Sequence, residues 1–215
     1  MILVAEEISK SYKTKSVLDN INLDIDKEEF VVVGGPSGSG KSTLLAILGG
    51  YLTPSKGHVY FKGEDIFGYS EDKWSILHQE KIGYVPQSNV MLKKYSIIDN
   101  LTLPFTIGNK KDSSSKELIG IALKHLENLE IADLADSYPS ELSGGQLKRV
   151  AIARAMMMNP EIILADEPTS GLDKRTGKII LDYLKDYVAK GNTVIIATHD
   201  EEAYAYATKK HLISE

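Results

Sequence analysis

The sequence contains no cysteine among its 215 residues, which excludes a disulfide framework and a thiolate metal site. It also lacks an apolar run of the roughly 20 residues that a membrane-spanning helix needs. The N-terminal stretch has no basic segment before an apolar one, so it does not read as a signal peptide. Basic residues are outnumbered 25 to 30 by acidic ones, and the formal net charge of −5 argues against a nucleic-acid partner. These absences favour a cytoplasmic protein.

Short apolar runs rich in β-branched residues alternate with helical periodicity, and this pattern predicts an α/β fold. Several of the runs are continuously apolar, which is typical of strands buried on both faces of a mainly parallel sheet. Residues 176–187 are expected to form a helix, and the polar segment 108–115 is expected to be a loop. The expected strands are residues 2–4, 30–33, 59–61, 82–85, 162–165 and 194–197.

The strongest local signal is the sequence GPSGSGKST at residues 35–43, between an expected strand and an apolar helix. That context is the one a P-loop requires. Glycines let successive amide N–H groups point at one phosphate group, and the helix N-terminus adds a favourable dipole. Lys41 is expected to reach the β- and γ-phosphates, Ser42 to hold Mg²⁺ and Thr43 to contact the α-phosphate. The nucleotide-binding candidates are Gly35, Pro36, Ser37, Gly38, Ser39, Gly40, Lys41, Ser42 and Thr43.

Two carboxylates follow the apolar run at residues 162–165. The C-terminal end of a buried strand is where open α/β sheets bind ligands. Asp166 is therefore expected to hold Mg²⁺, and Glu167 to polarise the water that attacks the γ-phosphate. The alternative is that these carboxylates only mark the start of a solvated loop. This is less favoured because the P-loop would bind a phosphate on which the carboxylates could act.

A third signal, LSGGQ at residues 142–146, introduces another helix. Ser143 can cap this helix, and the glycines leave its N-terminus bare, so it forms a second anion site. One nucleotide does not need two helix N-termini from one chain. A dimer in which each chain's second site closes over the other chain's P-loop explains the duplication. The candidates here are Ser143, Gly144, Gly145 and Gln146.

With these motifs in this order, the sequence resembles the nucleotide-binding domain of ATP-binding cassette (ABC) transporters. LSGGQ matches the family's signature, LADEP the Walker B motif and TSGLD the loop after it. The resemblance implies that Tyr12 stacks on adenine, that Gln87 contacts Mg²⁺ and the attacking water, and that His199 hydrogen-bonds the γ-phosphate. It also implies that Asp173 lies in a loop that crosses the dimer.

The resemblance further implies a P-loop NTPase with a mainly parallel RecA-like core sheet, an N-terminal antiparallel β subdomain and a helical signature subdomain. A single ABC ATPase domain is expected over residues 1–215. Its core and β subdomain would comprise residues 1–86 and 156–215, and the Q-loop and helical subdomain residues 87–155. Two copies would sandwich two ATP molecules with Mg²⁺, and hydrolysis to ADP and phosphate would open the dimer.

The stretches at residues 138–155 and 100–105 resemble the subfamily that serves macrolide, antimicrobial-peptide and lipoprotein systems. The implied function is to power export, or mechanical work on such a substrate, through a separate transmembrane permease at the inner face of the cell membrane. The permease would be contacted near residues 87–95. TSGLD and Pro86 are commoner outside this subfamily, so an importer subunit for amino acids or other small solutes stays an alternative. DNA-repair and translation-factor ATPases are less favoured, because one motif set is present and no coiled coil interrupts it.

Overall fold

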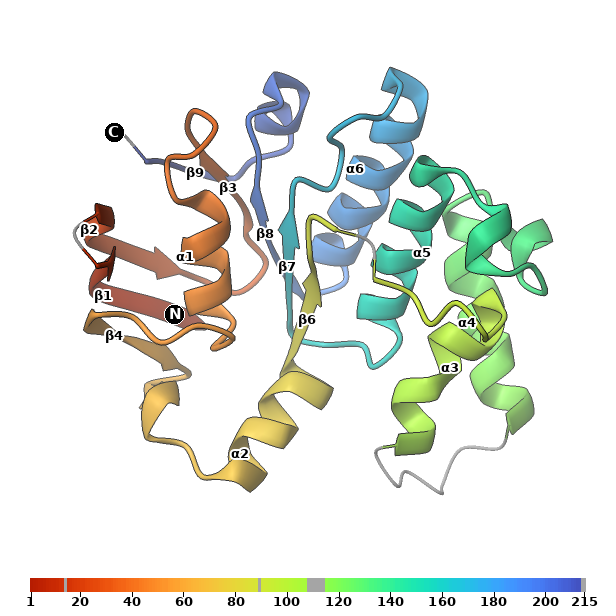
Figure 1. The fold of residues 1–215 in the computed structure, drawn as a ribbon, viewed down its shortest axis with the longest axis horizontal. Coiled ribbons are helices and arrows are strands. Elements are labelled where there is room, and N and C mark those ends of the chain that lie inside the picture. The colour runs from red at the N-terminus through yellow and green to blue at the C-terminus, as the bar shows by residue number, and fades with distance from the viewer. Residues whose placement is uncertain (14, 89, 108–114, 214–215) are drawn as a thin grey trace.

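The computed structural model describes residues 1–13, 15–88, 90–107 and 115–213 (Figure 1). The segment 108–115, expected to be a loop, lies outside the described residues except for Ser115, which begins a helix. In the described part of the chain, none of the helices has the length and apolar character needed to cross a membrane.

An antiparallel sheet occupies the N-terminal part of the chain, with strands in the order β2-β1-β4-β5. Its strands are β1 (Leu3–Tyr12), β2 (Lys15–Ile25), β4 (Lys56–Phe61) and β5 (Glu64–Asp65). Leu3 pairs with Ile25 on one side and Phe61 on the other, so that apolar side chains of three strands gather at one place. This sheet confirms the expected antiparallel β subdomain.

The central sheet has the strand order β6-β7-β8-β3-β9, and its neighbouring strands pair in parallel. Successive side chains of a strand point to opposite faces, and here each face is covered. Val31 and Val33 belong to the apolar core shared with α1 and the N-terminal sheet, whereas Phe30 and Val32 belong to the core shared with α5 and α6. Burial on both faces explains why the runs are continuously apolar. The strands are β3 (Phe30–Gly34), β6 (Ile82–Val85), β7 (Ile162–Asp166), β8 (Thr193–Ala197) and β9 (Lys209–Leu212).

Helices cover both faces of the central sheet and extend beyond it on the side away from the N-terminal sheet (Figure 1). The α-helices are α1 (Lys41–Leu48), α2 (Glu71–Ile76), α3 (Ile97–Ile107), α4 (Ser115–Asn128), α5 (Gly144–Met156) and α6 (Lys174–Ala189). Shorter helical turns span Ile66–Gly68, Leu77–Lys81, Ala132–Leu134, Pro139–Glu141 and Glu201–Ala205. Helices α3, α4 and α5 pack against one another, while α5 also contacts β6. The expected boundaries of the helical subdomain stay a prediction.

The six expected strands correspond to β1, β3, β4, β6, β7 and β8, although Ile2 precedes the start of β1. The helix expected at residues 176–187 lies within α6. Three further strands, β2, β5 and β9, were not expected from the sequence. Strand β2 alternates polar and apolar residues, and β9 is an edge strand with the polar sequence Lys-Lys-His-Leu. Neither has the continuous apolar run that marks a buried strand.

Candidate active site

The loop at residues 35–40 joins β3 to α1, and its conformation depends on glycine. Gly38 and Gly40 have φ angles of 84° and 96°, in the left-handed region that other residues adopt at a cost. A Cβ on Gly40 would lie 2.8 Å from the carbonyl oxygen of Val17. Because glycine has no side chain, the N-terminus of α1 carries no side-chain cap. Its amide groups therefore suit an anionic ligand.

Lys41 is a buried cation folded over this loop. Its Nζ donates to the carbonyl oxygens of Gly35 and Pro36, both at 2.8 Å. Within the described residues, the buried hydroxyl of Ser39 has no hydrogen-bond partner. An anchored ammonium, a hydroxyl without a partner and bare amide groups together form a site that fits a phosphate group.

Ser42 and Asp166 meet at the edge of the central sheet. Ser42 Oγ donates to Asp166 Oδ1 at 3.0 Å, across 124 residues of sequence. Burial raises the pKa of the Asp166 carboxyl, and the hydrogen bond from Ser42 acts in the opposite direction. The described residues contain no group of three or more His, Asp or Glu side chains that could hold a metal ion. A hydroxyl beside a carboxylate fits Mg²⁺ that takes its other ligands from a nucleotide and water.

Glu167 follows Asp166 and is held from the loop after β8. Its Oε1 lies 2.8 Å from Nδ1 of His199, and its Oε2 accepts a hydrogen bond from Thr198 Oγ1 at 3.1 Å. The backbone of Glu167 has a φ of 50°, and its amide donates to the carbonyl oxygen of Ala197 at 2.8 Å. The buried carboxylate therefore has a defined direction.

A cavity of about 230 Å³ brings the P-loop together with Glu167 and Gln87. Gln87 lies just beyond β6, and Glu167 just beyond β7, the neighbouring strand. The lining also includes Val17 of β2, which the sequence did not single out. The lining residues are Val17, Ser37, Gly38, Gly40, Lys41, Ser42, Thr43, Gln87 and Glu167.

The signature residues do not line this cavity. Ser143 caps α5: its Oγ accepts from the amide of Gln146 at 3.3 Å, and its own amide donates to Oε1 of Gln146 at 2.7 Å. A Cβ on Gly144 would meet no described atom within 4 Å, so this helix terminus is open. Gly145 lies beside it.

Asp173 and Tyr12 do not line the P-loop cavity either. Asp173 caps α6, and hydrogen bonds from the Thr176 hydroxyl and amide lower the pKa of its carboxyl. Tyr12, at the end of β1, is 49% exposed, and Nζ of Lys10 lies 5.2 Å from its ring centroid. One chain thus supplies the phosphate loop and carboxylates at one place, and the signature helix terminus at another.

Sequence analysis missed several polar residues that support the site. Lys148 of α5 donates from Nζ to the carbonyl oxygens of Glu167 and Ser170, both at 2.8 Å. Asp200 accepts a hydrogen bond from Thr169 Oγ1 at 2.7 Å. Thr198 and Asp200 flank His199 in the sequence and could have been found there. Nothing in the sequence distinguishes Lys148 from an exposed helical lysine.

Comparison with known proteins identifies the family. The ABC transporter family matches residues 18–170. The macrolide export ATP-binding/permease protein MacB of Campylobacter jejuni is 40% identical over 97% of this chain, which spans only 32% of that protein. The lipoprotein-releasing system ATP-binding protein LolD 1 of Chlorobium chlorochromatii is 36% identical, over 96% of this chain and 84% of its own. The putative hemin import ATP-binding protein HrtA of Staphylococcus epidermidis is 38% identical, over 97% and 95%.

The fold agrees with that of a solved ATP-binding cassette. The dimeric cassette MJ0796, in a post-hydrolysis state bound to ADP and Pi, superposes with a TM-score of 0.92 at 36% identity. The superposition covers 99% of this chain and 94% of the other. The sequence match, the fold and the phosphate-binding geometry agree, and the chain belongs to the ABC transporter family as one of its ATP-binding cassette ATPases.

Proposed function

We propose that the chain binds ATP with Mg²⁺ in the P-loop cavity and hydrolyses it as a head-to-tail dimer. The observation that carries this proposal is the cavity in which Lys41, Gln87 and Glu167 converge, and which the signature residues of the same chain do not line. The complete site would include Ser143 and Gly145 from a second copy. Asp173 would lie in the loop that crosses the dimer. The dimeric state of the similar cassette bound to ADP and Pi supports this arrangement.

The residues in and near the cavity would have separate roles in binding and hydrolysis. Lys41 and the amides of the P-loop would hold the phosphates, while Ser42, Asp166 and Gln87 would hold Mg²⁺. When bound, Mg²⁺ neutralises charge on the β- and γ-phosphate oxygens. The carboxylate of Glu167 would orient the attacking water and accept its proton. Tyr12 would stack on adenine.

His199 would contact both the general base, Glu167, and the γ-phosphate. A carboxylate only accepts hydrogen bonds, so Nδ1 of His199 is the donor toward Glu167. A ring that also donates from Nε2 to a γ-phosphate oxygen carries a positive charge. Such a ring would stabilise the negative charge that develops on the phosphoryl group.

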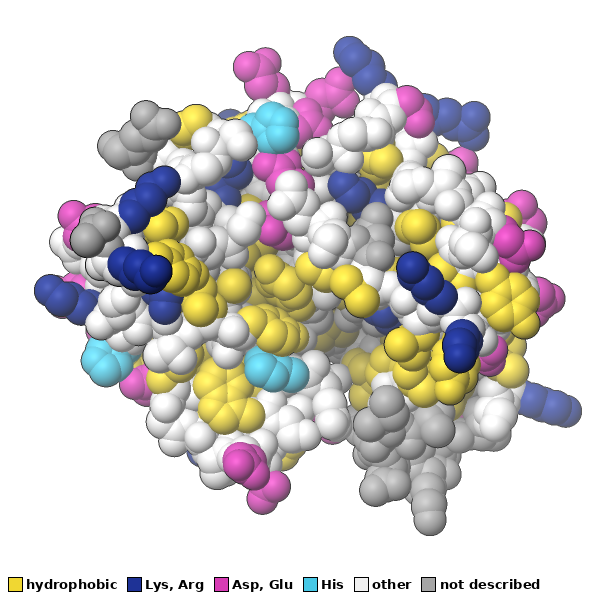
Figure 2. Space-filling model, in the orientation of Figure 1, with side chains coloured by type: hydrophobic (Ala, Val, Ile, Leu, Met, Phe, Trp, Pro, Cys, Tyr) yellow, Lys and Arg dark blue, Asp and Glu magenta, His cyan; other side chains and the backbone are white. Residues whose placement is uncertain are grey.

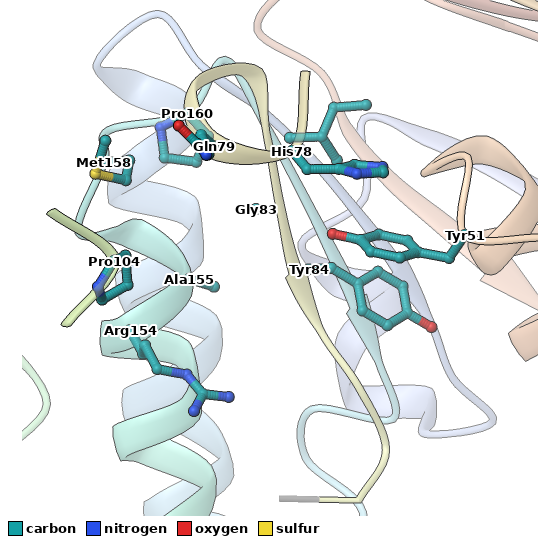
Figure 3. A pocket seen from close by; sticks show the side chains of 11 residues that line it. Tyr51, His78, Gln79, Gly83, Tyr84, Pro104, Arg154, Ala155, Met158 and Pro160 are labelled. Carbon is teal, nitrogen blue, oxygen red and sulfur yellow. The ribbon is translucent and has the colours of Figure 1, made fainter. Parts of the chain in front are cut away.

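We further propose that a groove between β6 of the central sheet and α5 is the docking surface for a transmembrane permease. Its volume is about 280 Å³, and its walls carry Tyr51, His78 and Tyr84 on one side and Arg154 and Met158 on the other (Figure 3). The Tyr51 and His78 rings are stacked with centroids 4.4 Å apart. Hydrophobic side chains gather in the hollow between the two halves of this face (Figure 2).

The segment predicted to contact the permease, residues 87–95, starts just past the end of β6, the strand that borders this groove. Its residue 89 lies outside the described residues. Val90, Leu92 and Tyr95 are exposed apolar side chains. Apolar side chains gathered on an exposed segment are typical of a protein–protein contact. The proposal places the chain at the cytoplasmic face of the membrane, held there by the permease.

The relatives favour a transporter of the type that exports a drug or releases a lipoprotein, because two of them bear those names. Import is the second candidate, since the HrtA relative is named for hemin import. Affinity purification of the chain from membranes, followed by identification of the accompanying permease, decides between them. Met158→Asp should reduce permease recovery, whereas Ile119→Asp, an exposed position on α4 outside the groove, should not. Full recovery with Met158→Asp would refute the docking surface.

The dimer is tested separately. A Glu167→Gln variant incubated with Mg-ATP should elute from a sizing column at twice the mass of the nucleotide-free chain. If the chain stays monomeric under these conditions, with and without its permease, the proposal that two copies share each nucleotide site is wrong.

A further inference from the structure

Lys148 is a lysine buried inside the protein near the middle of α5. It is only 7% exposed, although removing an ammonium group from water is costly unless its donors are satisfied. Both of its recorded hydrogen bonds go to main-chain carbonyl oxygens, those of Glu167 and Ser170, at 2.8 Å each. The side chain therefore connects the signature helix to the loop that follows β7.

That loop is a short and strained segment. Glu167 has a φ of 50°, which side chains other than glycine adopt at a cost. The carbonyl oxygen of Glu167 accepts from the Ser170 amide at 3.3 Å as well as from Lys148. Thr169 Oγ1, in the same loop, donates to Asp200 at 2.7 Å. The loop is thus held by Lys148 of α5 and by Asp200, which follows β8.

Electrostatics in this region agree with the geometry. Burial lowers the pKa of the Lys148 ammonium, and the nearby carboxylates of Glu167 and Asp166 act against that change. The ammonium is thus close enough to interact with both acidic side chains while its hydrogen bonds go to the backbone.

We propose that Lys148 is a positioning residue for hydrolysis, which fixes the backbone of Glu167 and Ser170 and so sets the direction of the Glu167 carboxylate. The inference rests on the proposed role of Glu167 as the group that orients the attacking water. An error of about 1 Å in such a group costs roughly 100-fold in rate. Lys148 lies on α5, the helix that begins at the signature sequence. One helix would therefore position Glu167 in its own chain and also complete the nucleotide site of the second copy.

The test compares Lys148→Met, which keeps most of the side-chain length and removes the donors, with Lys148→Arg, which keeps the charge and donors. Single-turnover hydrolysis of radiolabelled ATP and the Kd for ATP are measured for each purified chain. Lys148→Met should lower the hydrolysis rate by about 100-fold with the Kd changed less than about twofold. Lys148→Arg should restore most of the rate.

A matched control is available at the next position of the same helix. Arg149 also donates to two backbone carbonyls, those of Leu129 and Glu130 at 2.9 and 3.2 Å, but these belong to the turn that follows α4. Arg149→Met should lower the melting temperature and leave the hydrolysis rate within about threefold of the unmodified chain. If Lys148→Met unfolds, Lys148→Gln, which can donate to one carbonyl, should fold and show an intermediate rate.

Three results separate the explanations. Unchanged hydrolysis by Lys148→Met, in a chain where Glu167→Gln is inactive, overturns the positioning role alone. Parallel losses of stability, affinity and rate in Lys148→Met and Arg149→Met show a merely structural role and also overturn it. Hydrolysis by Glu167→Gln instead removes the proposed function of Glu167.

Discussion

Nδ1 of His199 and Oε1 of Glu167 lie 2.8 Å apart, although the two residues are 32 positions apart in the sequence. The contact forms because β7 and β8 are parallel neighbours that end at the same edge of the sheet. Thr198 donates to the other carboxylate oxygen at 3.1 Å. Both oxygens are thus oriented by the loop after β8, and a water held by Glu167 would be placed by that loop as well.

Glu167→Gln should abolish ATP turnover and leave ATP binding intact. The amide keeps the shape of the side chain but cannot accept a proton from water. We expect steady-state hydrolysis to fall by at least about 100-fold, within the range assigned to general bases. Phosphate release and equilibrium binding of ATP measure the two properties. A near-normal rate would remove Glu167 from this role.

Lys41→Ala should weaken nucleotide binding. It removes a cation that is already anchored over the P-loop at 2.8 Å from two carbonyl oxygens. Hydrogen bonds to charged groups contribute about 1.5–3 kcal/mol, so the Kd for ATP should rise by roughly ten- to a hundredfold. Calorimetric titration measures it. Lys178→Ala, which removes an exposed lysine of α6 paired with Asp182, is the control; equal affinities for both variants would contradict the phosphate assignment.

Ser42→Ala should raise the Mg²⁺ concentration needed for hydrolysis. It removes the hydroxyl that donates to Asp166 at 3.0 Å and would contact the ion. Loss of a ligand or of its orienting partner typically lowers metal affinity by about 10- to 100-fold. Hydrolysis measured across a Mg²⁺ titration, beginning in chelator, tests this. Ser75→Ala, at an exposed position of α2, should show the unmodified midpoint. An unshifted midpoint in Ser42→Ala would exclude Ser42 as a ligand.

The protein should lose stability as the pH falls from 7 to 5, in part through His125. Burial, followed by repulsion from Lys190 and Lys124, lowers the pKa of His125 to about 4 from an ordinary 6.5. Below pH 6.5 His125 binds a proton in the unfolded chain, whereas in the folded chain it binds a proton only below about pH 4. The unfolded state binds more protons in that range, so folding weakens, by about 2 kcal/mol at pH 5.

Urea unfolding at pH 7 and pH 5 measures that change. In the unmodified chain, Nδ1 of His125 lies 2.5 Å from the hydroxyl oxygen of Tyr183. The glutamine of His125→Gln can retain a hydrogen bond to this hydroxyl and does not titrate. The variant should therefore lose about 2 kcal/mol less than the unmodified chain over this interval. Identical losses would assign the pH dependence to other residues.

Much of this protein could be predicted from local sequence. Residues 35–43, with the apolar runs on either side, predict a phosphate-binding loop, because glycine conformation and the start of a helix depend mainly on neighbouring residues. The buried strands before Gly35 and Asp166 were found for a similar reason, since continuous apolar runs mark strands covered on both faces. The order of these motifs was enough to identify the family.

Tertiary structure decided the contacts between these motifs. The pairing of His199 with Glu167 depends on the alignment of two strands, and that of Lys148 with Glu167 depends on how α5 packs against the sheet. The polar strands β2 and β9 form because a neighbouring strand supplies their hydrogen bonds, which composition does not reveal. Local backbone preferences act over a few residues, whereas a side chain's partner is set by packing between segments far apart in the chain. For that reason the sequence determined the motifs, and the fold determined which of them share one cavity.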